Sequence, residues 1–403
     1  MHLVSTRNFG LYFVGNALSA SGLWFQNLAA AILVFRLTGS ELLLGVLTFS
    51  QFAPTLLLAP WSGSFADRFD RKRLLLVTQP VSALFAGTLA LVVALDVATA
   101  PLVIALVLAV GVVAALSVPA QQALIASLVP AREIPSAVAL NSMTYNIARA
   151  AGPALAALVI ATLGLTAAFA VNAASYLVFV AALLIVRPRP QERAARGESR
   201  LRDSLALVRR EPRLLAYLLI VMAVGFASDP VNTLAPAFAE EFGYPDTTAG
   251  FIIGVFGAGA VTAAFLVAGR VAGSRERMAV TLVILGLGVP AFSLSPWLWL
   301  GLPFLFAAGF GYLSSNTAAT SRLQLECAES QRGRIMALWS VAFLGLRPVA
   351  SLIDGAIASA AGVRVAGLIL PLPALAAAAV LLWIGPEGRR SGAARVTARR
   401  ALR

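Results

Sequence analysis

Residues 63–73 read GSFADRFDRKR, a short run with six charged side chains between two long apolar stretches. The stretches lie near 42–62 and 74–95. Each has about the 20 residues that a helix needs to cross ~30 Å of hydrocarbon. A charged turn between two such stretches indicates a helical hairpin that crosses a membrane twice.

The rest of the chain repeats this pattern. Of its 403 residues, 59% are hydrophobic and 12% are charged, and the mean hydropathy is +0.86. A soluble domain carries about 25% charged residues, so lipid must cover much of this protein. We therefore predict an all-α membrane protein with about twelve transmembrane helices. The predicted spans are 9–35, 42–62, 74–95, 100–118, 137–161, 166–186, 214–238, 249–269, 278–295, 297–319, 335–360 and 364–385.

The basic residues set the orientation, because cytoplasmic loops carry an excess of Lys and Arg. With the N-terminus inside, 27 of the 31 Lys and Arg residues fall on the inner side. Arg36 and Arg364 fall outside, and Arg149 and Arg347 lie within spans. We expect a multi-pass protein of the cell (cytoplasmic) membrane with both termini cytoplasmic. The split also accounts for the +13 net charge without a nucleic-acid partner.

The predicted spans divide into two groups of six around a charged stretch. That stretch either forms an amphipathic helix on the inner membrane surface or is an ordinary solvated linker. The expected divisions are a six-helix bundle at 1–186, a cytoplasmic linker at 187–213, a second bundle at 214–386 and a basic tail at 387–403.

The two halves resemble each other weakly. The sequence ALNS at 139–142 recurs as ALWS at 337–340, and the same spacing carries Arg149 onto Arg347. Two parallel six-helix repeats are a known transporter architecture, with the substrate site between them near the midplane.

The loop after the second span resembles the signature loop of the major facilitator superfamily, Gly-x-x-x-Asp-Arg-x-Gly-Arg-Lys, with Asp70 in place of the second Gly. The resemblance implies that fold, with twelve helices in two six-helix pseudo-repeats. It also implies a conformational latch, in which loop charges tie helix ends together in one state and release them in the other. A basic loop that only sets topology is the alternative. The latch residues would be Gly63, Asp67, Arg68, Arg71 and Lys72.

The fifth span carries a second pattern, NIARAAGPALA at 146–156. It resembles the Gly-Pro motif in helix 5 of the superfamily's exporters, here Gly152 and Pro153. A kinked packing helix with no bearing on transport direction is the alternative. Further stretches resemble the enterobactin-exporter and macrolide-efflux group of drug:proton antiporters, namely GLWFQ at 22–26, PAQQAL at 119–124 and QRGRIMAL at 331–338.

Four ionisable residues fall at membrane depth: Arg149, Arg347, Asp229 and Asp354. Such charges cost at least ~2.5–3.5 kcal/mol each on insertion scales and usually face a cavity or a partner. The arginines would bind an anionic cargo group or hold an aspartate in one state. Asp229, just before Pro230, is either the main proton carrier or a structural partner for a buried Arg. Asp354 is a second proton-coupling candidate or an interfacial residue.

Scattered polar residues within the spans are candidates for lining a large, mostly apolar substrate cavity. Each is otherwise a helix–helix hydrogen-bonding residue. These candidates are Asn16, Ser19, Gln26, Asn27, Tyr145, Asn232 and Asn316.

The pattern favours a transporter over an enzyme. The single His is His2 and the single Cys is Cys327, so no catalytic His–Cys pair or metal site is expected, and no cofactor. No nucleotide-binding loop occurs, so the energy source must be a gradient or a separate subunit. We expect proton-coupled export of an amphipathic small molecule, a siderophore or a drug. The alternatives are an importer or a lipid flippase of the same fold, or a transport-inactive receptor.

Overall fold

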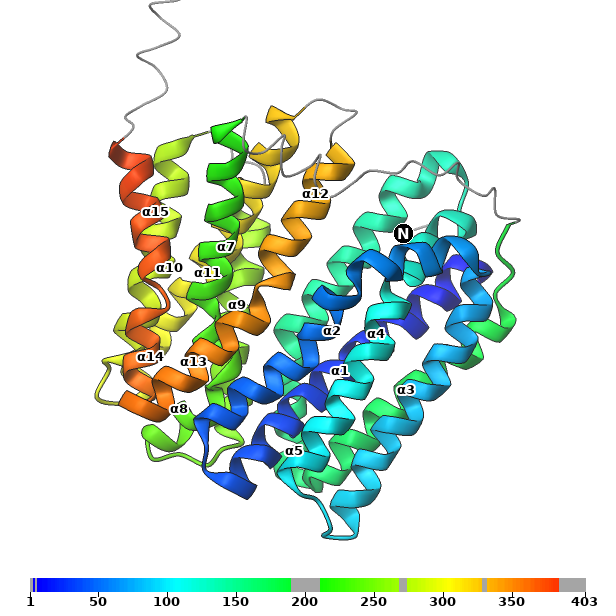
Figure 1. Ribbon diagram of the computed structural model, residues 1–403, viewed down its shortest axis with the longest axis horizontal. Helices are drawn as coiled ribbons and strands as arrows, with labels where there is room; N and C mark the ends of the chain where they lie inside the picture. The colour runs from blue at the N-terminus through cyan, green and yellow to red at the C-terminus, as the bar shows by residue number, and fades with distance from the viewer. Residues whose placement is uncertain (1–2, 4–5, 190–210, 268–273, 328–331, 384–403) are drawn as a thin grey trace, which may run out of the picture. The chain divides into compact units, whose positions relative to one another are not determined.

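The computed structural model describes residues 3, 6–189, 211–267, 274–327 and 332–383 (Figure 1). Residues 190–210, which are most of the predicted linker 187–213 with its two alternatives, and the basic tail at 387–403 lie outside the described residues. So do the side chains of residues 59–68, which include three of the predicted latch residues, Gly63, Asp67 and Arg68.

All regular structure in the described part of the chain is helical, which confirms the predicted all-α class. Apolar runs with few charges favour helices in lipid, because each helix satisfies its own backbone hydrogen bonds. The main helices are α1 (Arg7–Thr38), α2 (Glu41–Arg68), α3 (Arg71–Ala94), α4 (Ala100–Leu128), α5 (Ile134–Ile185), α7 (Pro212–Thr233), α8 (Ala235–Glu241), α9 (Thr248–Val267), α10 (Arg275–Ser293), α11 (Leu298–Glu326), α12 (Arg332–Ser340), α13 (Arg347–Ala361), α14 (Val363–Ile369) and α15 (Leu372–Trp383).

Within the described residues, 11 helical segments are long and apolar enough to cross a membrane. The predicted spans 137–161 and 166–186 both fall inside α5, except for Val186 at its C-cap. Gly164 interrupts α5 with a φ of 83°, a left-handed backbone conformation that glycine adopts without a steric penalty. The helix therefore bends where two spans were predicted to meet, and the structure is consistent with twelve crossings.

Three other predicted spans are broken within their length. The helix that contains Pro230 ends at Thr233, and the chain resumes as α8 after Leu234. A π-helical turn at Val341–Gly345 separates α12 from α13. The last predicted span is divided into α14 and α15. Such interruptions free backbone carbonyls and often occur at functional sites.

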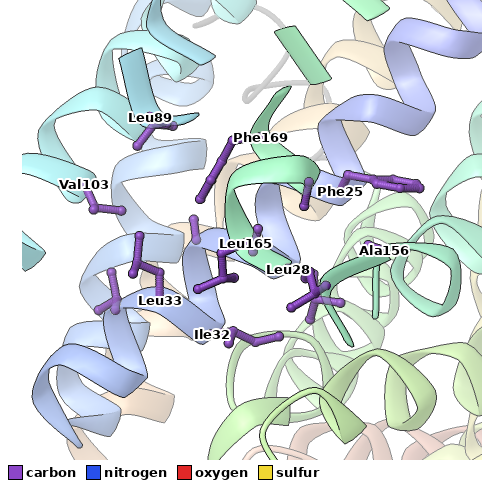
Figure 2. Close-up of a cluster of buried hydrophobic side chains, with 14 of the residues drawn as sticks. Phe25, Leu28, Ile32, Leu33, Leu89, Val103, Ala156, Leu165 and Phe169 are labelled. Atoms are coloured by element: carbon purple, nitrogen blue, oxygen red, sulfur yellow. The ribbon is translucent and has the colours of Figure 1, made fainter. Parts of the chain in front are cut away.

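The chain forms two compact units, and each is described by itself. Unit 1 contains residues 1–198, 229–257 and 344–366. Within it α1 packs along α5, α3 packs on α4 and α5, and α2 packs on α4 and α13. One cluster of its buried apolar side chains joins α1, α3, α4 and α5, and includes Phe25, Leu33, Leu89, Val103 and Phe169 (Figure 2).

Unit 2 contains residues 199–228, 258–343 and 367–403. Within its described residues α10 packs on α11 and on α15. The division of the chain into two six-helix bundles around a linker stays a prediction.

The helices of unit 1 meet in loops at two ends, the basic end and the far end. The basic end holds the loops at 69–70, 129–133 and 187–189, and the hydrogen bond from the Arg189 N–H to the Ser127 carbonyl at 3.0 Å joins two of its segments. The far end holds the loops at 39–40, 95–99 and 242–247.

Candidate functional site

A buried charge cluster in unit 1 joins the last turn of α7, from Asp229 on, to α13. Arg347 is the first residue of α13, just after the π-helical turn, and its Nε donates to Asp229 Oδ1 at 3.3 Å. The Asp229 side chain is 1% exposed and that of Arg347 is 18% exposed. A buried pair of this kind is stable only when both partners are present, since either charge alone would be uncompensated.

Two further side chains complete the surroundings of this pair. The Thr233 hydroxyl, one turn after Asp229 on α7, donates to Asp229 Oδ2 at 2.9 Å. The guanidinium carbon of Arg347 lies 4.5 Å from the centre of the Phe52 ring on α2, a cation–π contact. Both oxygens of Asp229 therefore accept a hydrogen bond, and an aromatic face covers Arg347.

Asp354 lies two turns after Arg347 on α13 and its side chain is 0% exposed. Its carboxyl group is a close neighbour of the Asp229 carboxyl. No other described residue gives either Asp354 oxygen a hydrogen-bond partner. The interfacial alternative for Asp354 concerns its depth in the membrane and stays a prediction. The fold brings the two candidate aspartates and one candidate arginine together.

The same face of α13 touches α2 through its backbone. A Cβ on Gly45 would lie 2.4 Å from the Ser351 carbonyl oxygen and 3.1 Å from Gly355 Cα. No side chain fits in that space, so the two helices cross in direct backbone contact. Ser351, Asp354 and Gly355 are all buried on α13, which places the crossing next to the charge cluster.

The helix-5 motif serves a close approach of the same kind. A Cβ on Gly152 would lie 2.7 Å from the Trp24 Cβ on α1. The next residue, Pro153, has its carbonyl oxygen 2.4 Å from the place where a Cβ of Gly250 on α9 would be. Gly152 and Pro153 therefore lie where α5 packs tightly on both α1 and α9. Arg149 lies one turn earlier on α5 and is half-buried.

The polar residues predicted to line a cavity have different surroundings. Gln26 is buried, and its Oε1 accepts from Asn172 Nδ2 on α5 at 2.8 Å. Asn16 donates to Asn141 Oδ1 at 2.8 Å. These two amides hydrogen-bond between helices. Ser19 is also buried, Asn27, Asn232 and Asn316 are half-buried, and Tyr145 is 45% exposed.

At the basic end, two predicted latch residues contact the C-terminal parts of neighbouring helices. Lys72 Nζ donates to the Val186 carbonyl at 2.7 Å and to the Leu184 carbonyl at 3.3 Å, where α5 ends. Arg71 Nη1 donates to the Ala123 carbonyl on α4 at 3.1 Å. Cations are favoured near helix C-termini by the unsatisfied carbonyls and the helix dipole. Both side chains thus bind the end of the hairpin to helices α4 and α5.

Asp70 stands where the superfamily pattern has glycine, and the structure shows its role. Its φ of −60° is an ordinary value, and its side chain caps α3 by accepting from the Arg73 N–H at 2.8 Å. The turn needs no glycine, and the aspartate supplies an acceptor for the first turn of the helix.

Exposed ion pairs occur at the far end. Arg36 in the last turn of α1 binds Asp246 through two hydrogen bonds, with Nη2 and Oδ1 2.7 Å apart. Arg364 Nε lies 2.8 Å from Glu241 Oε1. These pairs connect α1 and α14 to the end of α8 and the loop that follows it.

Sequence reasoning missed three residues of the cluster and its surroundings. Thr233 follows Asp229 at the i+4 spacing that places side chains on one helix face, and that spacing was a usable signal. The sequence contains no comparable signal for the contacts of Phe52 and Gly45, because these contacts depend on how α2 crosses α13.

The family of the chain is shown by a match along nearly its whole length. The family model described as transmembrane secretion effector matches residues 4–388. The chain belongs to this family of major facilitator superfamily transporters. It is therefore a multi-pass membrane transporter, as the loop resemblance predicted.

Sequence relatives include named transporters, one of them an efflux protein. The chain is 28% identical over 303 residues to an uncharacterised MFS-type transporter, YfiS, of Bacillus subtilis, covering 72% of this chain and 69% of the relative. It is 27% identical to the staphyloferrin A transporter of Staphylococcus aureus and 22% identical to macrolide efflux protein A of Streptococcus pyogenes. Each of these two matches covers 58% of this chain, and they span 60% and 59% of the relatives' lengths.

Solved structures agree with the family in fold. A bacterial homologue of the human lysosomal transporter Spinster, in an inward-facing and occupied conformation, superposes with a TM-score of 0.74 at 15% identity, covering 93% of this chain and 95% of the other. The nucleoside transporter NupG gives a TM-score of 0.69 at 15% identity, covering 95% of this chain and 98% of the other. At these identities the likeness establishes the fold alone.

Proposed function

We propose that this transporter exports an amphipathic small molecule, a siderophore or a drug, in exchange for protons by alternating access. The observation that carries the proposal is the Asp229 carboxylate, buried in a membrane helix beside Arg347 and Asp354. Intramembrane carboxylates with a basic partner mark proton pathways in transporters. The substrate class is taken from the relatives, two of which are named for a siderophore and a macrolide.

Asp229 is the group we assign to proton coupling, together with Asp354. Arg remains protonated in proteins and cannot shuttle a proton. Among the described spans the other carboxylates lie near helix ends, as Glu41 and Glu326 do. A rearrangement that changes the distance between Asp229 and Arg347 would change the proton affinity of Asp229, because a nearby cation favours the charged form and burial the neutral form.

The test uses the purified protein in lipid vesicles with an imposed pH gradient. We expect staphyloferrin-type siderophores or macrolides to accumulate on the acidic side, and a protonophore to abolish the accumulation. Asp229→Asn should lose this uphill transport and keep downhill counterflow. The matched control is Asp246→Asn, which removes a carboxylate at the far end.

Three outcomes would contradict the proposal. Accumulation that ignores the pH gradient excludes proton coupling. Transport in the opposite direction, or movement of lysolipids in place of soluble cargo, identifies an importer or a flippase. Saturable binding without flux identifies a transport-inactive receptor.

We also propose that the basic end of unit 1 faces the cytoplasm, with both termini on that side and the protein in the cell membrane. The proposal rests on the 27 basic residues assigned to that side. Cysteines introduced at Phe69 and Val97, in a Cys327→Ser background, test it. A membrane-impermeant thiol reagent added to intact cells should label only position 97, and labelling of position 69 alone would reverse the orientation.

A further inference from the structure

Two aspartate side chains are neighbours in the α7–α13 cluster. Asp354 is fully buried, and within the described residues no donor reaches either of its oxygens. The group beside it is the Asp229 carboxyl, which is also an acceptor when ionised. Two carboxyl groups form a hydrogen bond only when one of them carries a proton.

The charge balance of the cluster also favours one proton shared by the two carboxyl groups. The described part of α7 carries Arg213 near its start and Asp229, and α13 carries Arg347 and Asp354. On α2, which packs against α13, Glu41 at the first residue is the single ionisable group among the described side chains. At the far end, Arg364 pairs with Glu241 and Arg36 with Asp246. Two ionised aspartates beside Arg347 would leave one negative charge buried and unpaired, which is strongly unfavourable.

The hydrogen bonds show which carboxyl holds the proton. Asp229 accepts from Arg347 Nε at 3.3 Å and from the Thr233 hydroxyl at 2.9 Å. Hydrogen bonds donated to a carboxylate favour its ionised form. Asp354 accepts none from the described residues. A proton on Asp354 would therefore cost less than one on Asp229, and its hydroxyl could donate to the neighbouring carboxylate.

We infer that Asp229 and Asp354 form one proton-binding site, in which Asp354 carries the proton and Asp229 is the ionised partner of Arg347. This deepens the proposed function and rests on it for the role of the proton in transport. The same site links the proton to a helix contact, since Asp354 lies between Ser351 and Gly355, which touch Gly45 on α2. Loss of the proton places two like charges side by side and drives the end of α7 at Asp229 away from α13. Binding of the proton draws them together.

The first experiment detects the proton directly and needs no transport. Infrared spectra of wild-type protein in lipid, with and without isotope-labelled aspartate, should contain the carbonyl stretching band of a protonated carboxyl at neutral pH. Asp354→Asn should remove that band. The control Asp246→Asn, which changes an ion-paired aspartate at the far end, should leave it unchanged.

The second experiment separates the two aspartates. Asn at position 354 retains a hydrogen-bond donor and resembles the protonated state, so Asp354→Asn should fold, bind cargo and lose at least about tenfold in pH-driven transport. Asp354→Glu, which can carry a proton, should regain part of it. Asp229→Asn instead removes the partner of Arg347 and should lower the thermal unfolding temperature more than Asp354→Asn does.

The outcomes distinguish this inference from the proposed function. If wild-type vesicles show pH-driven export while Asp354→Asn keeps both the infrared band and the transport, the shared proton is wrong and the proposed function stands. If the band is lost in Asp354→Asn but wild-type export ignores the pH gradient, the proton site stands and proton-driven export is wrong.

Discussion

Two of the places in unit 1 where charged side chains join helices, the basic end and the α7–α13 cluster, differ in their surroundings. At the basic end, Lys72 and Arg71 bind backbone carbonyls at helix ends, close to water. In the α7–α13 cluster, Arg347 binds a side-chain carboxylate that is 1% exposed. Water can replace the partners at the first place and cannot at the second. The buried cluster must therefore respond to a change of charge with a change of structure, while the basic end adjusts locally.

The largest effect is expected from Arg347→Met, which removes the cation from the buried cluster. Asp229 then keeps only uncharged neighbours, the Thr233 hydroxyl and the protonated Asp354, and becomes an uncompensated buried charge. Breaking such a pair costs ~3–5 kcal/mol. We expect a large fall in the thermal unfolding temperature of the purified protein and loss of pH-driven transport.

The double variant Arg347→Met with Asp229→Asn removes both charges and should recover most of the stability but not the transport. Arg364→Met is the matched control, because it breaks an ion pair whose partners are 33% and 42% exposed. Exposed pairs contribute ~0–1 kcal/mol, so this variant should unfold near the wild-type temperature. An Arg347→Met protein as stable as the wild type would show that the pair is not the main stabilising contact of the cluster.

The membrane spans, the charged loops and the buried charged residues could be predicted from the sequence for a physical reason. Membrane helices need long apolar runs, so the spans and the charged loops between them follow from hydropathy. The scarcity of charge within spans also marked Arg347, Asp229 and Asp354 as residues that need a partner.

The pairing of Asp229 with Arg347 could not be predicted from the sequence. Arg149 and Arg347 occupy matching places in the weak repeat, and nothing in the residue order favours one of them as the partner of Asp229. The choice depends on which helices cross and at which residue. That is decided by contacts such as Gly45 against Ser351, which leave no periodic signal.

A substitution at Gly45 tests the crossing of α2 and α13. Gly45→Ala places a Cβ 2.4 Å from the Ser351 carbonyl oxygen, a backbone atom that cannot move without shifting α13. Overpacking of this kind costs ~1–3 kcal/mol. We expect lower thermal stability and slower transport, with the infrared band of the Asp354 carboxyl weakened because α13 is displaced.

Gly87→Ala is the matched control, since a Cβ at that position on α3 meets nothing within 4 Å. Alanine also favours a helix over glycine by ~1 kcal/mol, so the control should be as stable as the wild type or more stable. Equal behaviour of the two variants would exclude the crossing as a structural constraint.

A smaller effect is expected at the basic end from Lys72→Gln. The substitution removes the cation from the carbonyls of Leu184 and Val186. A charge at a helix terminus contributes ~0.3–1 kcal/mol, so the protein should fold normally and transport several-fold more slowly. Arg73→Gln removes the same charge from an exposed neighbour and serves as the control. If both variants slow transport equally, the loop acts through its total charge and not through the contact with α5.

The smallest effect is expected from substitutions of Asp70. Different substitutions there remove either its helix-capping hydrogen bond or only its negative charge. Its side chain accepts from the Arg73 N–H at 2.8 Å, and loss of such a cap costs ~1 kcal/mol with alanine but only a few tenths with glycine. Amide hydrogen exchange in the first turn of α3 should therefore accelerate about fivefold in Asp70→Ala and less in Asp70→Gly, the residue of the superfamily pattern. Asp70→Asn keeps the acceptor and removes the charge, so it should exchange and transport like the wild type. Should Asp70→Asn instead slow transport as much as Lys72→Gln, the charge of Asp70 takes part in the latch. The basic end would then resemble the buried cluster in depending on a carboxylate.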